Sequence, residues 1–139
     1  IAVLIARAVI GTDAAEVAAA LIVLVGHNWP VFLQFKGGRG ILTALGGLAI
    51  MVPIAAVIAT VAFIAITGLS RYISLGSVIG VIIGAIAILG LALADVQSNT
   101  YTVYGFIAAT MIVWQHRDNI QRIRDGSERR LGQAATKAD

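Results

Sequence analysis

Apolar stretches separated by short polar segments run along the chain from Ile1 to residue 115. The apolar stretches cover residues 1–10, 14–25, 41–69, 75–94 and 100–114. Inside a bilayer every backbone N–H and C=O group must find a partner within the protein, so a long apolar stretch is expected to be helical there. The pattern therefore predicts membrane helices joined by polar turns at Gly11–Asp13 and Asp95–Asn99.

The apolar stretch 41–69 carries no charged residue and admits two interpretations. At about 1.5 Å per residue it is long enough for one tilted span, which would place Arg39 and Arg71 on opposite sides of the membrane. Pro53 disfavours the helical conformation of the residue before it, and so favours two helices that meet at that point. We predict two helices, which bring both arginines to the same side.

The apolar stretch 14–25 is expected to form a short helix. Asp13 and Glu16 resemble a capping pair that opens this helix, and the apolar run ends at Val25. Such a helix measures about 20 Å, against a hydrocarbon core of about 30 Å. The residues after Val25 should then start below the membrane surface, where irregular backbone is tolerated only if it is buried in protein or lines a wet cavity. This predicts a recessed polar pocket.

Three glycines of the stretch 75–94 recur at every fourth position, namely Gly76, Gly80 and Gly84. Residues at this spacing lie on one face of a helix. We interpret them as a surface for close packing against a neighbouring helix rather than as a ligand site.

Composition and charge agree with a membrane protein. Hydrophobic residues make up 59% of the chain and charged residues 12%, whereas a soluble domain has about 25% charged residues. Apart from Arg7, the basic residues gather at residues 36–39, at Arg71 and from Arg117 onward. Basic loops beside membrane helices mark the cytoplasmic side. We therefore expect all three clusters, and a polar tail of residues 116–139, on the cytoplasmic side of the membrane.

The expected fold is an all-α, polytopic bundle of membrane helices, short and broken in places, around a recessed pocket on the cytoplasmic side. Residues 1–139 are expected to form a single membrane-embedded domain. The chain contains no cysteine, so it has neither a disulfide nor a thiolate site.

The segment 26–40, Gly-His-Asn-Trp-Pro-Val-Phe-Leu-Gln-Phe-Lys-Gly-Gly-Arg-Gly, holds the densest candidate chemistry. Lys36 and Arg39 flank glycines whose backbone amides can converge without a Cβ in the way. A helix is expected to start at Ile41, so its free N–H groups and positive dipole end point into the same loop. We interpret this as a phosphate-binding loop unlike a Walker A loop, with an ordinary basic turn as the alternative.

Two further segments on the same side carry candidate residues. In the first, Ser74 is positioned to cap the helix that follows, and Arg71 is either an anchor or a substrate contact. In the second, helical spacing would place His116 and Asn119 on one face. The end of the preceding helix favours the imidazolium form of His116. An amphipathic interfacial tail is the simpler alternative for this second segment.

Together the three segments resemble the acyl-phosphate:glycerol-3-phosphate acyltransferase family of bacterial inner membranes. The matching stretches are residues 26–40, Arg-Tyr-Ile-Ser-Leu-Gly-Ser at 71–77, and His-Arg-Asp-Asn-Ile-x-Arg with Gly-Ser-Glu at 116–128. The resemblance implies transfer of a fatty acyl group from acyl phosphate to the 1-hydroxyl of glycerol 3-phosphate. The products would be lysophosphatidic acid and phosphate, at the first step of phospholipid synthesis. Expected partners are both substrates and membrane lipid, with no nucleic acid, cofactor or metal.

The resemblance also assigns roles to residues. It implies glycerol 3-phosphate binding by Lys36, Gly37, Gly38, Arg39 and Gly40. It implies catalytic roles for His116 and Asn119, a structural role for Glu128, and a place in the pocket for His27 and Ser77. No Cys or recognisable Ser-His-Asp spacing is present, so direct attack by the glycerol hydroxyl is simpler than an acyl-enzyme. Either His116 or a substrate phosphate oxygen could take the proton.

The sequence departs from the family pattern in three places. The first motif of the family, Ser-Gly-Asn-Ile-Gly-Ala-Thr-Asn with a following arginine, does not occur. It is expected to precede the helix that contains Ile1, so we expect the chain to be truncated at its N-terminus and inactive alone. Arg39 stands where lysine is usual, which keeps the charge but replaces a point charge by a planar fork. Ile41-Leu42 replaces the commoner Val-Ala, which is a packing change.

A small anion transporter or channel component is the competing class. A transporter is expected to have polar groups or broken helices near the middle of the membrane. Polar residues near the middle of the predicted spans are few, namely Thr60, Thr67 and Thr110, and their hydroxyls can bond their own helix. The cations gather instead at one surface, which favours an enzyme that meets a soluble substrate from one side.

Overall fold

The computed structural model describes residues 1–133, and all regular structure within that range is helical. The elements are α1 (Ala2–Val9), α2 (Asp13–Asn28), a short 3-10 helix η1 (Val31–Leu33), α3 (Ile41–Met51), α4 (Pro53–Ser70), α5 (Ile73–Leu93), α6 (Thr100–Gln115) and α7 (Arg117–Arg124). The predicted all-α class is confirmed. Residues 134–139, the end of the expected tail, lie outside the described residues.

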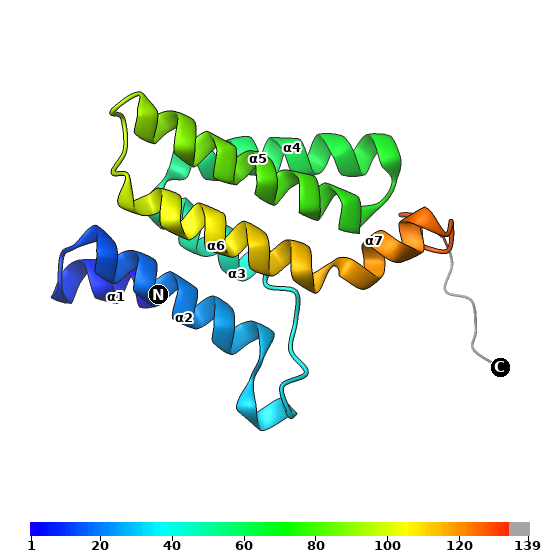
Figure 1. Ribbon diagram of the computed structural model, residues 1–139, viewed down its shortest axis with the longest axis horizontal. Helices are drawn as coiled ribbons and strands as arrows, with labels where there is room; N and C mark the ends of the chain where they lie inside the picture. Colours follow the sequence, from blue (N-terminus) through cyan, green and yellow to red (C-terminus); the bar gives the residue numbers. More distant parts are fainter. Residues whose placement is uncertain (134–139) are drawn as a thin grey trace.

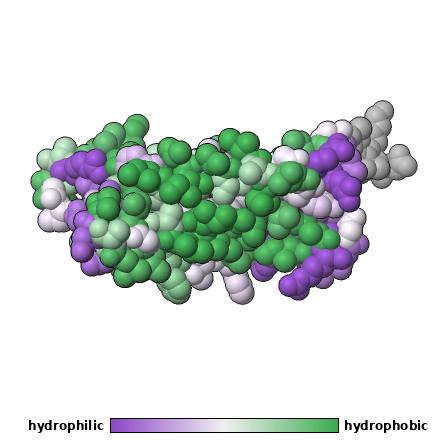
Figure 2. All heavy atoms as spheres, turned by 90° about the horizontal axis from the view of Figure 1, so that it is seen from above, coloured by the Kyte–Doolittle hydropathy of each residue, from purple (hydrophilic) through white to green (hydrophobic). Residues whose placement is uncertain are grey.

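The long helices lie side by side along one direction and form a bundle (Figure 1). α4 and α5 form a hairpin with an extensive contact, α6 returns beside α5, and α2 packs against α6 and α3. In the face seen in Figure 2, hydrophobic residues cover the middle of the molecule and hydrophilic residues gather at its two ends. Three segments are long and apolar enough to cross a membrane, namely Asp13–Leu33, Pro53–Ser70 and Ile73–Leu93. This is the surface of a polytopic membrane protein.

The hairpin predicted at Pro53 is present. α3 ends at Met51, Val52 leaves the helical region with φ −138° and ψ 76°, and Pro53 is the first residue of α4. A proline is favoured there because the first N–H of a helix has no partner in any case. As a result, the residues before α3 and the α4–α5 turn lie at the same end of the bundle (Figure 1).

The glycine stripe of α5 is the packing surface that its spacing predicts. A Cβ added at Gly80 would lie 3.1 Å from the carbonyl oxygen of Ala59, and one at Gly84 would lie 3.0 Å from the Ala59 Cβ. At Gly76 an added Cβ would come within 2.9 Å of the Phe63 carbonyl oxygen. These distances are shorter than ordinary van der Waals contact, so α4 and α5 approach this closely only because α5 presents no side chain there.

The start and end of α2 differ from the prediction. Thr12 caps the helix, since its Oγ1 accepts a hydrogen bond of 3.3 Å from the N–H of Ala15. The Asp13–Glu16 capping pair is therefore wrong. The helix also continues to Asn28, three residues beyond the predicted end, and the apolar segment that contains it is long enough to span a membrane. The argument for a recessed pocket from a short second helix thus fails, although α3, with 11 residues, is short.

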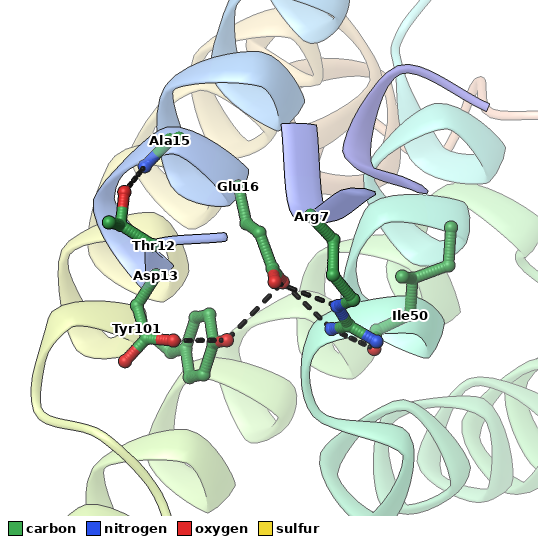
Figure 3. A network of polar contacts seen from close by, with 7 residues as sticks. All are labelled: Arg7, Thr12, Asp13, Ala15, Glu16, Ile50 and Tyr101. Atoms are coloured by element: carbon green, nitrogen blue, oxygen red, sulfur yellow. Dashed lines mark hydrogen bonds and ion pairs between the residues drawn. The ribbon is translucent and has the colours of Figure 1, made fainter. Parts of the chain in front are cut away.

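Asp13 and Glu16 belong instead to a polar network at the end of the bundle where α3 meets α4 (Figure 3). The Arg7 guanidinium donates to both carboxylate oxygens of Glu16 at 2.7 and 2.8 Å, and to the Ile50 carbonyl oxygen at 2.9 Å. The Tyr101 hydroxyl donates to Asp13 at 2.9 Å. The network joins α1, α2, α3 and α6, which explains why an arginine stands within the first apolar run.

Candidate active site

The three segments singled out in the sequence all lie toward the other end of the bundle. The loop 34–40, the α4–α5 turn and the region around α7 all lie there (Figure 1). The positive charge of Arg39 also contributes to the lowered pKa of His116, so the first and third segments lie within electrostatic range of each other. Packing of the helices has therefore brought together segments that are far apart in the sequence.

The glycine-rich loop folds back over the end of α2. The Gly38 N–H donates to the His27 carbonyl oxygen at 3.3 Å. An added Cβ at Gly37 would lie 2.6 Å from the Asn28 carbonyl oxygen, and one at Gly38 would overlap Nε2 of the exposed His27 ring. These two glycines thus have a packing reason that the sequence did not reveal. A larger residue at Gly37 would push the loop away from the α2 backbone, and one at Gly38 would displace the His27 ring or the loop.

Gly40 marks the start of α3. It has φ +75°, a left-handed conformation that favours glycine, and an added Cβ would lie 2.6 Å from Oδ1 of Asn28. No side chain caps α3, so the N–H groups of its first turn lack a capping partner. Lys36 and Arg39 are exposed, and neither forms an ion pair within residues 1–133. Two cations and an uncapped helix start form the arrangement expected of an anion site.

Asn28 lies beneath this loop and was not predicted from the sequence. Its side chain is 1% exposed, and neither Oδ1 nor Nδ2 has a hydrogen-bond partner in the described part of the chain. A buried amide without a partner is unusual, which makes Asn28 a candidate site residue. The only signal in the sequence is the position of this polar residue between His27 and Trp29.

His116 lies between α6 and α7 and is 1% exposed. Its Nδ1 lies 2.8 Å from the Ile112 carbonyl oxygen. A carbonyl only accepts, so Nδ1 carries the proton of the neutral ring and Nε2 is left as an acceptor. Burial lowers the pKa of His116 and outweighs the opposite effect of the Ile112 carbonyl. The expectation that the helix end favours imidazolium is therefore wrong, because the ring is removed from water.

Asn119 shares the buried face of α7 with His116, as helical spacing predicted. Its Nδ2 donates to Oε1 of Glu128 at 2.7 Å, and the Ser74 hydroxyl donates to the same oxygen at 2.6 Å. Arg122 Nε donates to the other carboxylate oxygen at 2.8 Å. Burial raises the pKa of Glu128, but the hydrogen bonds from Ser74, Asn119 and Arg122 outweigh this effect and the pKa is lowered.

The second segment serves mainly to hold the end of the described chain. α5 begins at Ile73 without a side-chain cap, so the prediction that Ser74 caps it is wrong. The Arg71 guanidinium donates to the Leu131 carbonyl oxygen at 2.8 and 3.2 Å, and the Leu131 N–H donates to the Arg71 carbonyl oxygen at 2.6 Å. These contacts favour the anchor interpretation of Arg71.

An apolar cavity of about 280 Å³ opens next to this end of the bundle, between α3, α4, α5 and α6. Ile41, the residue after Gly40, lines it, and so does Ile112, whose carbonyl binds His116. Ser77 also lines it, with its hydroxyl donating to the Ile73 carbonyl oxygen at 2.9 Å. The lining contains no charged residue, which fits a hydrocarbon chain and not an anion pathway through the bundle.

The fold defines an integral membrane protein, and its candidate site is an exposed basic loop next to an apolar cavity. A sequence model of the family described as "Glycerol-3-phosphate acyltransferase" matches residues 1–126. The chain belongs to this family, which confirms the resemblance of its three segments.

Relatives of known name agree with this assignment. "Glycerol-3-phosphate acyltransferase 3" of Dehalococcoides mccartyi (strain CBDB1) is 42% identical over 96% of this chain and 68% of its own length. "Glycerol-3-phosphate acyltransferase" of Halalkalibacterium halodurans is 40% identical over 83% of this chain and 56% of its own length. The chain thus spans from about half to about two thirds of the length of the curated relatives it matches.

The fold is also similar to a solved structure. The crystal structure of PlsY (YgiH), an integral membrane glycerol 3-phosphate acyltransferase, in its glycerol 3-phosphate form, superposes with a TM-score of 0.83. The sequence identity is 31%, and the match covers 94% of this chain and 64% of that one. A second structure of PlsY, in its lysophosphatidic acid form, matches with the same score.

Proposed function

We propose that this protein transfers a fatty acyl group from acyl phosphate to the 1-hydroxyl of glycerol 3-phosphate, as the first step of phospholipid synthesis. The observation that carries the proposal is the meeting, at one end of the bundle, of an exposed basic loop at an uncapped helix start and an apolar cavity. The loop fits a phosphate and the cavity fits a fatty acyl chain. Membership of the family supports glycerol 3-phosphate as the acceptor, and PlsY was crystallised in a glycerol 3-phosphate form and a lysophosphatidic acid form.

The loop is proposed to bind glycerol 3-phosphate. Lys36 and Arg39 would neutralise the phosphate, and the first N–H groups of α3 would donate to its oxygens. Gly37, Gly38 and Gly40 would let the loop lie close to His27 at the end of α2, which fixes the position of the cations. The planar guanidinium of Arg39 could bind two phosphate oxygens at once, which a lysine could not.

The acyl chain would lie in the apolar cavity with its reactive carbonyl next to His116. The glycerol hydroxyl oxygen would attack the acyl carbonyl carbon, the bond from that carbon to the phosphate oxygen would break, and phosphate would leave with the electron pair. The products are lysophosphatidic acid and inorganic phosphate. Positioning of the two substrates and stabilisation of the departing phosphate by the cations would supply most of the rate increase.

His116 and Asn119 are proposed to act where the two substrates meet. His116 is held neutral with Nε2 as an acceptor, so it could take the hydroxyl proton; a phosphate oxygen of a substrate could take it instead. Ser77 would face the start of the acyl chain, since it lines the cavity. Glu128 would be structural, because its carboxylate already accepts from Ser74, Asn119 and Arg122.

The proposal is tested by assaying the complete protein, purified in detergent, with glycerol 3-phosphate and either acyl phosphate or acyl-CoA. We expect lysophosphatidic acid and one phosphate per turnover with acyl phosphate, and no product with acyl-CoA. Turnover with acyl-CoA, or phosphate release without lysophosphatidic acid, would contradict the proposed donor. Omission of glycerol 3-phosphate is the control, because it separates transfer from simple hydrolysis.

A further inference from the structure

We infer that a groove on the outer side of α5 and α6, closed at one end by α7, binds an anionic phospholipid that is not a substrate. The groove has a volume of about 920 Å³. Its walls are apolar over most of their length, and arginines and a tryptophan of α6 and α7 stand at its end. A phospholipid has the same order of parts, a hydrocarbon tail followed by a charged headgroup.

The apolar part of the groove matches one leaflet in length. Ile82 and Ile86 of α5 face Phe106 of α6 across it, and the side chains of Ile86 and Phe106 are 62% and 73% exposed. From Phe106 to its end at Gln115, α6 rises about 14 Å at 1.5 Å per residue, and Arg117 follows in α7. Half of a hydrocarbon core of about 30 Å is close to this length, so a lipid tail could lie along the groove while its headgroup reaches α7.

The headgroup end is basic and is held in place. The Arg117 guanidinium lies 5.2 Å from the centre of the Trp114 ring and donates to the Trp114 carbonyl oxygen at 3.1 Å. Its contact with Asp118, at 3.7 Å between exposed side chains, is weak. Arg124, which also lines the groove, forms no ion pair within the described residues. Asp125 is the single acidic residue of the lining, so a net positive charge faces the headgroup.

This chemistry selects an anionic phospholipid over other occupants. Two guanidinium groups favour a phosphate, and basic pockets between helices at the headgroup level bind anionic lipids. Trp114, with 62% of its surface exposed, is a side chain that prefers the same level. A free phosphate would leave the exposed apolar walls without a partner.

The groove is separate from the candidate active site. His116 and Asn119 are buried on the face of α7 turned toward the bundle, whereas Arg117 and Arg124 are exposed. The 280 Å³ cavity extends from the α5–α6 pair toward α3 and α4, and among the lining residues it shares only Ala85 with the groove. A lipid in the groove would therefore not block substrates, but it would bridge α6 to the helix that carries Asn119.

Two measurements on the complete protein in detergent test the inference. Native mass spectrometry measures how much lipid each variant retains, and thermal unfolding measures the unfolding temperature after lipid is added back. Phosphatidylglycerol is the probe, and phosphatidylcholine and inorganic phosphate are the comparisons. One variant, Arg117→Gln with Arg124→Gln, removes the headgroup charges. A second, Ala109→Phe, fills the apolar part of the groove without touching a charge. Arg129→Gln, an exposed arginine outside the groove, is the matched control.

We expect the unmodified protein and the Arg129→Gln control to retain phosphatidylglycerol. Both groove variants should retain at least about tenfold less of it. Phosphatidylglycerol should raise the unfolding temperature, and phosphatidylcholine should not. Equal retention of phosphatidylglycerol by the double variant would overturn the inference, and so would its absence from the unmodified protein. Equal stabilisation by inorganic phosphate would show a site for free phosphate instead, and would also overturn it.

Discussion

Asn119 donates a hydrogen bond of 2.7 Å from its side-chain amide to the carboxylate of Glu128. The same carboxylate accepts hydrogen bonds from Ser74 of α5 and Arg122 of α7, so one acidic side chain links the start of α5 to α7. The position of Asn119, and of the neighbouring His116, therefore depends on a residue that follows α7 in the chain.

Replacing Glu128 by alanine should destabilise this end of the bundle. The change leaves the buried hydroxyl of Ser74 and the buried amide of Asn119 without their acceptor, and such a loss costs about 1–3 kcal/mol. The measurement is the free energy of unfolding in detergent, with Arg129→Ala as an exposed control. An unfolding free energy equal to that of the unmodified protein would show that the carboxylate does not hold α7.

The same contacts predict an acid-sensitive stability. The folded pKa of Glu128 is lowered from the ordinary value of 4.5, so its contribution is fully present above that value and is lost as the pH falls through the lowered pKa. The unmodified protein should therefore lose more stability than Glu128→Gln between about pH 6 and pH 3. Unfolding temperatures measured in parallel over this range provide the test, and parallel curves would contradict it.

His116 should be needed for turnover and not for folding. We expect His116→Ala to lower kcat by about 100-fold or more, and Asn119→Ala to behave similarly, while Arg129→Ala keeps normal turnover. Thermal unfolding of each variant separates a lost reaction from a lost fold. Near-normal turnover by a folded His116→Ala variant would return this segment to the interfacial-tail interpretation.

The dependence of kcat on pH tests the protonation state of the His116 ring. Since burial lowers the pKa of His116, the neutral form should persist below pH 6.5, the ordinary value. If His116 takes the proton, kcat should fall on the acid side only below that pH, and His116→Gln should lose this limb. An acid limb that lies above pH 6.5 in the unmodified protein would contradict the lowered pKa.

Gly38→Ala should raise the KM for glycerol 3-phosphate more than the KM for acyl phosphate. An added Cβ would overlap the His27 ring, so either this exposed ring or the loop itself must shift. The double variant His27→Ala with Gly38→Ala removes the clash. It is compared with His27→Ala alone, because His27 is itself a candidate pocket residue. If the double variant recovers the normal KM, the glycine is needed only for packing against His27. An equal rise for both substrates in the single variant would count against this loop as the glycerol 3-phosphate site.

The orientation of the bundle can be tested with single cysteines, since the chain contains none of its own. We expect cysteines at Lys36 and Arg129 to react with an impermeant thiol reagent only from the cytoplasmic side. A cysteine at Gln97, in the loop between α5 and α6, should react from the opposite side. Labelling of Lys36 and Gln97 from one side would contradict the proposed topology.

The sequence by itself determined the helices, the break at Pro53, the packing role of the glycine stripe and the family. Each of these depends on residues only a few positions apart, or on the order of a few short motifs. Apolar length sets which segments can cross a membrane, proline acts on its immediate neighbour, and every fourth residue of a helix lies on one face. Such signals can be recognised before the chain folds.

Only the tertiary structure decided the partners of the polar side chains that bind across the bundle. Asp13, Glu16 and Ser74 all had the chemistry of helix caps, yet Tyr101 donates to Asp13 from 88 residues away, and Ser74 donates to Glu128 across 54 residues. Thr12 caps α2 instead. A local pattern shows what a side chain can bind, but the partner is chosen by helix packing, because a hydrogen bond forms only between groups brought within about 3 Å.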